Sequence, residues 1–251
     1  MQIINKKYLL LLLLCLPNII SAAEVKVAVA SNFLSTLRQI KTEFEKETGH
    51  KILVSAASTG KLYAQISHGA PFEVFLAADS LRPKLAEENG LAEMNSRYAY
   101  ASGRLAVWSA SEALQGKDCR QWLATGQYQR IAIANPKTAP YGEAAMQVLK
   151  KMQLWPEVKP KLVRGENIGQ AFQYVSTGNA QLGLVAMSQV LDPKNRQTSC
   201  YWEVPASYHQ SLEQHLVVLK KGTSNTAVSD FVNFIKSARV KKIIAANGYG
   251  V

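Results

Sequence analysis

The residues of this chain best suited to bind a ligand lie in short polar turns that follow apolar, strand-like segments. Four such turns each precede a helix-like segment: Ser31-Asn32, Ser58-Thr59-Gly60, Tyr141-Gly142 and Asn167-Ile168-Gly169. The first N–H groups of a helix lack intrahelical partners and carry the positive end of the helix dipole, so each turn is a candidate anion-binding site. Hydroxyl, amide and N–H donors together suit an oxyanion that keeps no proton. None of the turns carries an arginine, which would give stronger bidentate contacts to an anion.

Each turn also has a purely structural interpretation. The serine, threonine and asparagine side chains in these turns are ordinary N-cap residues, worth about 0.5–2 kcal/mol of stability each. The glycines are common turn formers. Tyr141 is more often a packing residue than a ligand contact, and its backbone N–H is expected to matter more than its ring. Taken singly, each turn is explained by capping, and only their number and placement favour a ligand site.

Alternating strands and helices must position these turns. Strand-like segments are expected at 25–30, 51–55, 72–77, 131–134, 161–164, 182–186 and 212–219. Apolar residues recur at helical spacing between 34 and 47, and Gly49 is expected to end that helix. Further helices are expected at 61–67, 143–152 and 170–176. This alternation predicts mainly parallel sheets covered by helices. Ligands of such sheets bind beyond the carboxyl ends of the strands, where the four turns fall.

The chain, 251 residues long, is expected to form two similar halves. The strand-like segment 98–109 is interrupted by Gly103, as expected where a chain passes from one domain to another. Segment 212–219 is expected to be the return crossing. We therefore predict one α/β lobe from residues 24–100 together with 211–251, and a second from 101–210. Two lobes joined by two or more strands suit a hinge with a ligand cleft between them.

Composition indicates a globular protein that does not bind nucleic acid. Hydrophobic residues make up 47% of the chain and charged residues 19%. The formal net charge is +11, but the lysines and arginines are scattered and form no basic stripe interleaved with aromatic residues. The positive charge is therefore expected to support solubility and a weak long-range attraction of anions.

Residues 1–23 are predicted to be a signal peptide. Two lysines precede an apolar run at 8–16, and Ser21-Ala22-Ala23 offers the small residues of a cleavage site. A lipoprotein signal that uses Cys15 is the alternative, but two leucines stand where small residues would be expected. Cleavage after Ala23 would give an exported, periplasmic chain. Its net charge would be +9, because the removed segment holds two lysines and no acid.

Two cysteines would remain in the exported chain, Cys119 and Cys200. In an oxidising compartment such an even pair is a candidate disulfide. The alternative is that both are small buried apolar residues.

Catalytic and metal-binding motifs are incomplete or missing from the sequence. The segment Ser58-Thr59-Gly60-Lys61 resembles the end of a phosphate-binding P-loop, but the leading glycine would fall at Ser55 and Leu62 replaces the magnesium-binding residue. The sequence has no G-x-S-x-G nucleophile elbow. The histidines show no metal-ligand spacing and are expected to be solvated surface residues: His50, His68, His209 and His215. We therefore predict neither an enzyme, nor a cofactor, nor a metal ion bound directly by protein ligands.

Four segments are distinctive beyond their turns: VASNFLSTL, ASTGKLYAQISHGAPFEVFLAAD, NPKTAPYG and GENIGQAFQYVSTGNAQLGLVA. In these segments the chain resembles the periplasmic molybdate-binding proteins of ABC importers, and the resemblance covers essentially all of 24–251. It implies a type II periplasmic binding fold, in which two α/β lobes close on tetrahedral molybdate or tungstate. Molybdenum would be present only within the bound oxyanion. The implied partner is the membrane permease of the importer, and we expect a monomer.

The resemblance also implies a ligand set, carried over residue by residue: Ser31, Asn32, Thr59, Tyr141 and Ile168. The serine and the threonine would give a hydroxyl and an amide, whereas the tyrosine and the isoleucine would give mainly a backbone N–H. Some members of the family add a tyrosine hydroxyl at the position held here by Ala186, and Asn32 is expected to supply a compensating donor. Glu73, where many members carry aspartate, is expected to have a structural role.

Three other functions remain open from the residues alone. The first is a receptor for sulfate or another tetrahedral anion, which only cavity size would distinguish from molybdate. The second is an exported enzyme acting on an anionic substrate, with Tyr141 or Lys61 in a chemical role. The third is a sensor-type binding protein that partners a receptor instead of a permease. An enzyme predicts a titratable group in the cleft, whereas neutral donors predict little pH dependence of affinity between about pH 6 and 8.

Overall fold

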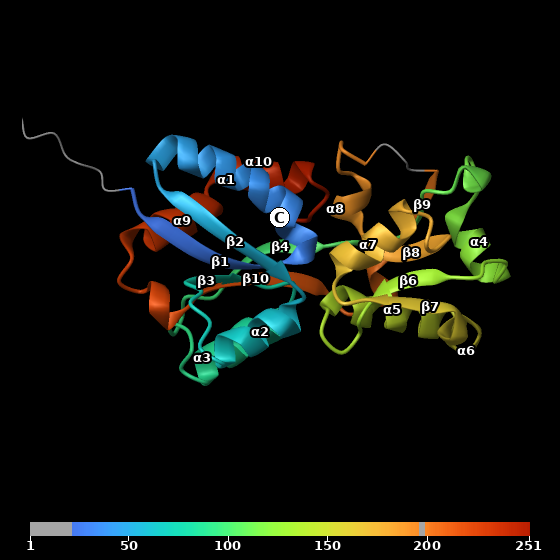
Figure 1. The fold of residues 1–251 in the computed structure, drawn as a ribbon, viewed down its shortest axis with the longest axis horizontal. Helices are drawn as coiled ribbons and strands as arrows, with labels where there is room; N and C mark the ends of the chain where they lie inside the picture. The colour runs from blue at the N-terminus through green and yellow to red at the C-terminus, as the bar shows by residue number, and fades with distance from the viewer. Residues whose placement is uncertain (1–21, 196–198) are drawn as a thin grey trace, which may run out of the picture.

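The computed structural model describes residues 22–195 and 199–251, and it consists of two α/β lobes that lie side by side (Figure 1). Each lobe contains a five-stranded sheet. The predicted signal peptide falls almost entirely outside the described residues, and so does Cys15. Within the described part of the chain, no helix combines the length and the apolar character needed to span a bilayer.

The first lobe is built on a sheet with the strand order β2-β1-β3-β10-β4. Its strands are β1 Glu24–Ala30, β2 Lys51–Ala57, β3 Val74–Leu76, β4 Tyr98–Gly103 and β10 Leu212–Val218. Its helices are η1 Ser31–Phe33, α1 Leu34–Thr48, α2 Thr59–Ser67, α3 Leu81–Glu88, η5 Lys220–Gly222, α9 Thr226–Lys236 and α10 Ala238–Ala246. Helices α1, α9 and α10 cover one face of the sheet, and α2 and α3 cover the other (Figure 1).

Residue alternation along β1 explains this two-sided packing. Val25, Val27 and Val29 belong to the apolar cluster under α1, α9 and α10. Ala28 points to the opposite face and belongs to the cluster under α2 and α3. Because successive side chains of a strand point to opposite faces, this nearly continuous apolar run is what a strand covered on both faces requires.

The second lobe repeats the arrangement with the strand order β7-β6-β8-β5-β9. Its strands are β5 Leu105–Ser109, β6 Ile131–Ala134, β7 Leu162–Gly165, β8 Leu182–Ala186 and β9 Cys200–Glu203. Its helices are η2 Glu112–Leu114, α4 Cys119–Thr125, α5 Pro140–Lys151, α6 Trp155–Val158, η3 Lys159–Lys161, α7 Ile168–Ser176, α8 Met187–Val190 and η4 Ala206–Tyr208.

The two sheets share one topology. In the first, β1 pairs in parallel with β2 and β3, and only β10 runs against its neighbours. In the second, β6 pairs in parallel with β7 and β8, and only β5 runs against its neighbours. Both sheets are therefore mainly parallel, with one reversed strand next to the edge.

The chain first crosses between the lobes next to Gly103. Strand β4 ends at Gly103 in the first sheet and β5 begins at Leu105 in the second, so that the segment expected as one interrupted strand forms two strands in different lobes. The boundary placed after residue 100 falls inside β4, three residues before that strand ends. The chain returns between β9 and β10.

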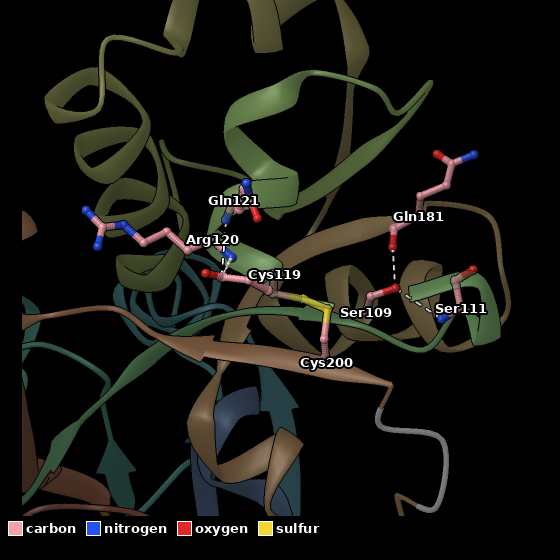
Figure 2. The surroundings of a disulfide bond; sticks show 8 residues. Ser109, Ser111, Cys119, Arg120, Gln121, Gln181 and Cys200 are labelled. Carbon is pink, nitrogen blue, oxygen red and sulfur yellow. Dashed lines mark hydrogen bonds between the residues drawn. A yellow bond between two sulfur atoms is a disulfide. The ribbon is translucent and has the colours of Figure 1, made fainter. Parts of the chain in front are cut away.

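Cys119 and Cys200 are joined by a disulfide, with their Cα atoms 5.6 Å apart (Figure 2). The bond links the first residue of α4 to the first residue of β9, the outer strand of the second sheet. The pattern of the sequence had not identified either element. Both are short, and β9 pairs with β5 only through tertiary contact.

The prediction that the histidines are solvated is wrong for two of them. His50 is buried, its Nδ1 atom accepts a hydrogen bond from the Ala23 N–H, and its Nε2 atom lies 3.3 Å from an Asp230 oxygen. His215 lies on β10 with its side chain only 13% exposed. Both partners of His50 are distant in sequence, so the pattern around the residue did not reveal its burial.

Candidate functional site

A small cavity lies where the two lobes meet. Its walls are formed by Ala30, Ser31, Asn32, Ala57, Ser58, Thr59, Ala78, Ala139, Pro140, Tyr141 and Ile168. The cavity volume between them is about 10 Å³, room for about one water molecule and far below the roughly 300–1,000 Å³ of pockets that hold drug-sized ligands. All five residues implied as ligands by the resemblance line this cavity, and its walls carry no charged side chain.

Three of the implied residues occupy the first turns of long helices. Thr59 is the first residue of α2, Tyr141 the second of α5, and Ile168 the first of α7. Ser31 and Asn32 begin η1, which runs directly into α1. Because first-turn N–H groups have no partner within the helix, the four helix starts, from two lobes, place neutral donor groups around one small space.

The helices begin two or three residues earlier than the sequence pattern predicted. Expected starts near 61, 143 and 170 become Thr59, Pro140 and Ile168. Proline at the first helical position is favourable because its fixed φ suits the helix, and the N–H that it lacks would have had no partner within the helix. The turn residues that carry the hydrogen-bond donors therefore lie in the first turns of helices, where their backbone positions are fixed more firmly than in loops.

Close packing sets the position of α5. A Cβ atom on Gly142 would lie 2.3 Å from the Ala134 carbonyl oxygen at the end of β6. Only glycine allows the helix start to approach the strand end so closely, and this approach brings Tyr141 to the cavity.

Capping explains only one of the four turns. The Asn167 side chain caps α7 by accepting a hydrogen bond from the Gln170 N–H over 3.1 Å. Ser58 is the N-cap residue of α2, yet its side chain makes no capping hydrogen bond. The Ser58 hydroxyl is buried and has no hydrogen-bond partner among the residues that the structure describes. A buried polar group without a partner is costly, so this hydroxyl, absent from the predicted ligand set, is a further candidate donor.

The hydroxyls of Ser31 and Thr59 each accept a hydrogen bond from a backbone N–H. Thr59 Oγ1 accepts from Ala78 N over 3.0 Å, and Ser31 Oγ accepts from Gly169 N of the other lobe over 3.4 Å. A hydroxyl that accepts still holds its own proton to donate. Both side chains can therefore donate to an anion in the cavity.

The Asn32 side chain donates its hydrogen bonds to other protein residues and not to the cavity. Its Nδ2 atom donates both protons, one to Gln214 Oε1 over 3.0 Å and one to the Tyr249 hydroxyl over 3.2 Å. An amide nitrogen has two protons, so none is left for a ligand. The part of Asn32 that can serve the cavity is its backbone N–H, and the expected compensating donor is not its side chain.

Tyr141 contributes a neutral ring. Its hydroxyl is buried and accepts a hydrogen bond from Gln214 Nε2 over 3.3 Å. Burial holds the pKa of this hydroxyl well above its ordinary value. The phenol therefore stays protonated at neutral pH, which is unsuited to a general base.

Two other residues weighed from the sequence lie away from the cavity walls. Glu73 accepts hydrogen bonds from the Lys26 N–H and from Asn225 Nδ2, and so ties β1 to the turn before α9, a structural arrangement. Lys61 forms an ion pair with Glu166 across the lobes. Among the residues described, no cluster of three or more His, Cys, Asp or Glu side chains could hold a metal ion.

Direct contacts hold the lobes together around the cavity. The Gly60 N–H donates to the Thr138 carbonyl oxygen over 2.8 Å, close to the second and third turns. On another side, Ser35 Oγ donates to Asp192 Oδ2 over 2.6 Å. These contacts, with the ion pair of Lys61, join the two lobes around the cavity.

The chain matches the model of one protein family, described as bacterial extracellular solute-binding protein, over residues 25–250. The chain belongs to this family. This solute-binding protein is 45% identical over 230 residues to the molybdate-binding protein ModA of Azotobacter vinelandii, which covers 92% of this chain and 91% of that protein. It is 39% identical over 229 residues to ModA of Rhodobacter capsulatus, covering 91% and 89%. These relatives are solute-binding proteins and not enzymes.

The fold of this solute-binding protein has a close counterpart among solved structures. The periplasmic molybdate-binding protein of Azotobacter vinelandii superposes with a TM-score of 0.85 at 35% identity, over 90% of this chain and 99% of that one. The predicted two-lobed α/β architecture of a periplasmic binding protein is confirmed.

Proposed function

We propose that this solute-binding protein is a receptor for a tetrahedral oxyanion, molybdate and also tungstate, in the cavity between its lobes. The observation that carries the proposal is the cavity itself, a small space bounded by four helix starts and by the hydroxyls of Ser31, Ser58 and Thr59, with no charged side chain in its walls. The names of relatives at 45% and 39% identity support molybdate as the ligand.

The donor chemistry favours an anion that is fully deprotonated. The Ser31 and Thr59 hydroxyls already accept from backbone N–H groups, and the first-turn N–H groups can only donate. Phosphate at neutral pH keeps a proton, which needs an acceptor. Molybdate, tungstate and sulfate dianions need none, so the donor chemistry disfavours phosphate and leaves cavity size to separate the other three.

The test is calorimetric titration of the exported protein with molybdate, tungstate, sulfate and phosphate. We expect tight binding of molybdate and tungstate and much weaker binding of sulfate and phosphate. Affinity for molybdate should change little between about pH 6 and 8, because neither the dianion nor the donors change charge there. Sulfate binding as tight as molybdate would refute the assignment.

Delivery to the permease of an ABC importer is the proposed consequence of binding. Cells that lack this protein should lose uptake of molybdate at low external concentration and regain it with the wild-type gene. We further propose a monomer in the periplasm, released by cleavage after Ala23. Sequencing the N-terminus of the exported protein should give Glu24 as its first residue, and uncleaved or lipid-modified protein would contradict this.

A further inference from the structure

Gln214 is a fully buried polar residue on a strand whose neighbouring inward residues are apolar. It is 0% exposed on β10, between the buried Leu212 and Leu216. The pairing of β4 with β10 shifts register beside it, so that Tyr100 is an extra residue in β4. Bulges of this kind re-aim side chains and are common near functional sites. A buried amide at a core position requires hydrogen-bond partners, and the residues that it binds indicate its role.

Gln214 lies at the centre of a buried polar network. Its Oε1 atom accepts from Asn32 Nδ2 and from the Tyr100 hydroxyl, each over 3.0 Å. Its Nε2 atom donates to the Tyr141 hydroxyl over 3.3 Å. The network is completed by Tyr249, whose hydroxyl donates to the Asn32 carbonyl oxygen over 2.7 Å.

The network joins the first and third turns of the cavity across the lobes. Asn32 lies in η1 of the first lobe and Tyr141 in α5 of the second, and both line the cavity. One amide therefore holds two cavity residues from opposite lobes by their side chains. Their backbone N–H groups are left as the groups that can face an anion.

Glycine at the crossover makes room for this contact. A Cβ atom on Gly103 would lie 2.2 Å from the Tyr141 hydroxyl and 2.7 Å from Gln214 Nε2. The last residue of β4 is thus packed directly against the bond between Gln214 and Tyr141. The network lies where the chain first passes from one lobe to the other.

We propose that Gln214 is a positioning residue of the oxyanion site, which sets the spacing of the Asn32 and Tyr141 N–H groups by binding both side chains when the lobes are closed. The inference rests on the proposed oxyanion function. It goes beyond that function by assigning part of the affinity to a residue that does not line the cavity.

The first test replaces Gln214 by leucine. Gln214→Leu removes all three hydrogen bonds at similar volume and leaves Asn32 and Tyr141 without their shared partner. We expect the Kd for molybdate to rise about tenfold or more. The matched control is Gln121→Leu on α4, an exposed glutamine in the second lobe, which should leave the Kd unchanged.

The second test replaces Gln214 by glutamate and follows the Kd for molybdate with pH. A protonated glutamate offers an acceptor oxygen and one donor, enough to replace the bonds that the amide makes here. The ionised form loses the donor and adds a negative charge close to the bound anion. Burial raises the pKa of such a carboxyl. We expect the Kd of Gln214→Glu for molybdate to be close to that of wild type at about pH 5.5 and at least tenfold higher than that of wild type at about pH 8. The Kd of wild type should not change over this range.

The outcomes separate the two proposals. If wild type binds molybdate and both Gln214 variants match it at every pH, the positioning role is overturned and the receptor function stands. If wild type binds no oxyanion, the receptor function is overturned and the positioning role with it. A role in stability alone would lower the unfolding temperature of both variants without the pH-dependent change in Kd. If Gln214→Leu does not fold, the pH series of Gln214→Glu decides.

Discussion

At the scale of single residues, two neighbouring hydroxyls differ in what they do before a ligand arrives. Thr59 Oγ1 accepts from the Ala78 N–H, so it supports the fold of the first lobe. Within the described part of the chain, Ser58 Oγ is buried without a hydrogen-bond partner, so it adds no hydrogen bond to the fold there. Both residues line the cavity. The two hydroxyls therefore separate a contribution to stability from a contribution to binding.

Substitution of these hydroxyls should separate the two effects. Ser58→Ala should leave the ligand-free protein as stable as wild type, or more so, and weaken molybdate binding about tenfold if the hydroxyl donates to the anion. Thr59→Ala should weaken binding similarly and also cost about 1–3 kcal/mol of unfolding free energy, because the Ala78 N–H loses its acceptor. Urea unfolding and calorimetry give the two quantities, and Thr59→Ser is the control that keeps the hydroxyl. Unchanged affinity in Ser58→Ala would show that this hydroxyl does not face the ligand.

The buried tyrosines give a pH dependence of stability. Burial raises the pKa of Tyr249 to about 12 and holds the pKa values of Tyr100 and Tyr141 well above the ordinary value. Between pH 10 and 12 the unfolded chain loses phenol protons that the folded chain keeps, so stability is full below about pH 10 and falls as pH rises toward 12. Urea unfolding across this range should show the decline. The slope should be shallower in Tyr249→Phe, and equal slopes would contradict the assignment.

At the scale of elements, the disulfide strengthens the second lobe away from the cavity. Figure 1 places α4 and β9 at the end of that lobe, whereas the cavity residues come from the starts of η1, α2, α5 and α7. The Cys119–Cys200 bond closes a loop with a sequence separation of 81 residues. The bond should therefore affect the free energy of unfolding and not the affinity for the ligand.

Removing the bond should lower stability without changing affinity. In the chain-entropy account, a loop of this length corresponds to about 4 kcal/mol of unfolding free energy. The variant with both Cys119→Ala and Cys200→Ala should melt at a clearly lower temperature, as should wild type after reduction. The Kd for molybdate, measured well below the melting temperature, should stay within twofold of wild type. A large loss of affinity would mean that the outer edge of the second sheet is coupled to the cavity.

At the scale of the whole molecule, contacts between the lobes are part of the site. The Gly60 N–H donates to the Thr138 carbonyl oxygen of the other lobe. A Cβ atom on Gly60 would lie 2.9 Å from that oxygen. Glycine therefore permits the lobes to approach closely enough to enclose the cavity.

Alanine at this position should oppose closure. Gly60→Ala should weaken molybdate binding several-fold, because the lobes would have to shift apart to avoid the contact. The ligand-free protein should be as stable or up to about 1 kcal/mol more stable, because alanine suits a helix better than glycine. Ser67→Ala, at the exposed end of the same helix, is the control for helix propensity. Unchanged affinity in Gly60→Ala would show that the bound form does not need this approach.

Local sequence pattern and the family resemblance together predict most of the fold and the residues that line the cavity. Most of the strands and the four turns could be recognised because apolar runs, small polar residues and glycines act over a few neighbouring positions. Strand β9 was missed, and the one strand expected at 98–109 is two strands. The resemblance in segments such as VASNFLSTL implied Ser31, Asn32, Thr59, Tyr141 and Ile168, which all line one cavity. Helix starts were placed two or three residues late because polar and proline residues suit both the turn and the first helical position.

The tertiary structure determines which atoms of these residues are free to bind an anion. In the sequence, Asn32 is equally a ligand donor or a helix cap, yet its amide binds Gln214 and Tyr249, separated from it by 182 and 217 positions. Ser58 has the sequence signature of a cap, yet its hydroxyl caps nothing and lies buried without a partner. Hydrogen bonds between residues so far apart depend on how the two sheets pack and not on local pattern. The sequence therefore determined that neutral donors would meet, and the packing of the lobes determined which side chains remain to bind an anion.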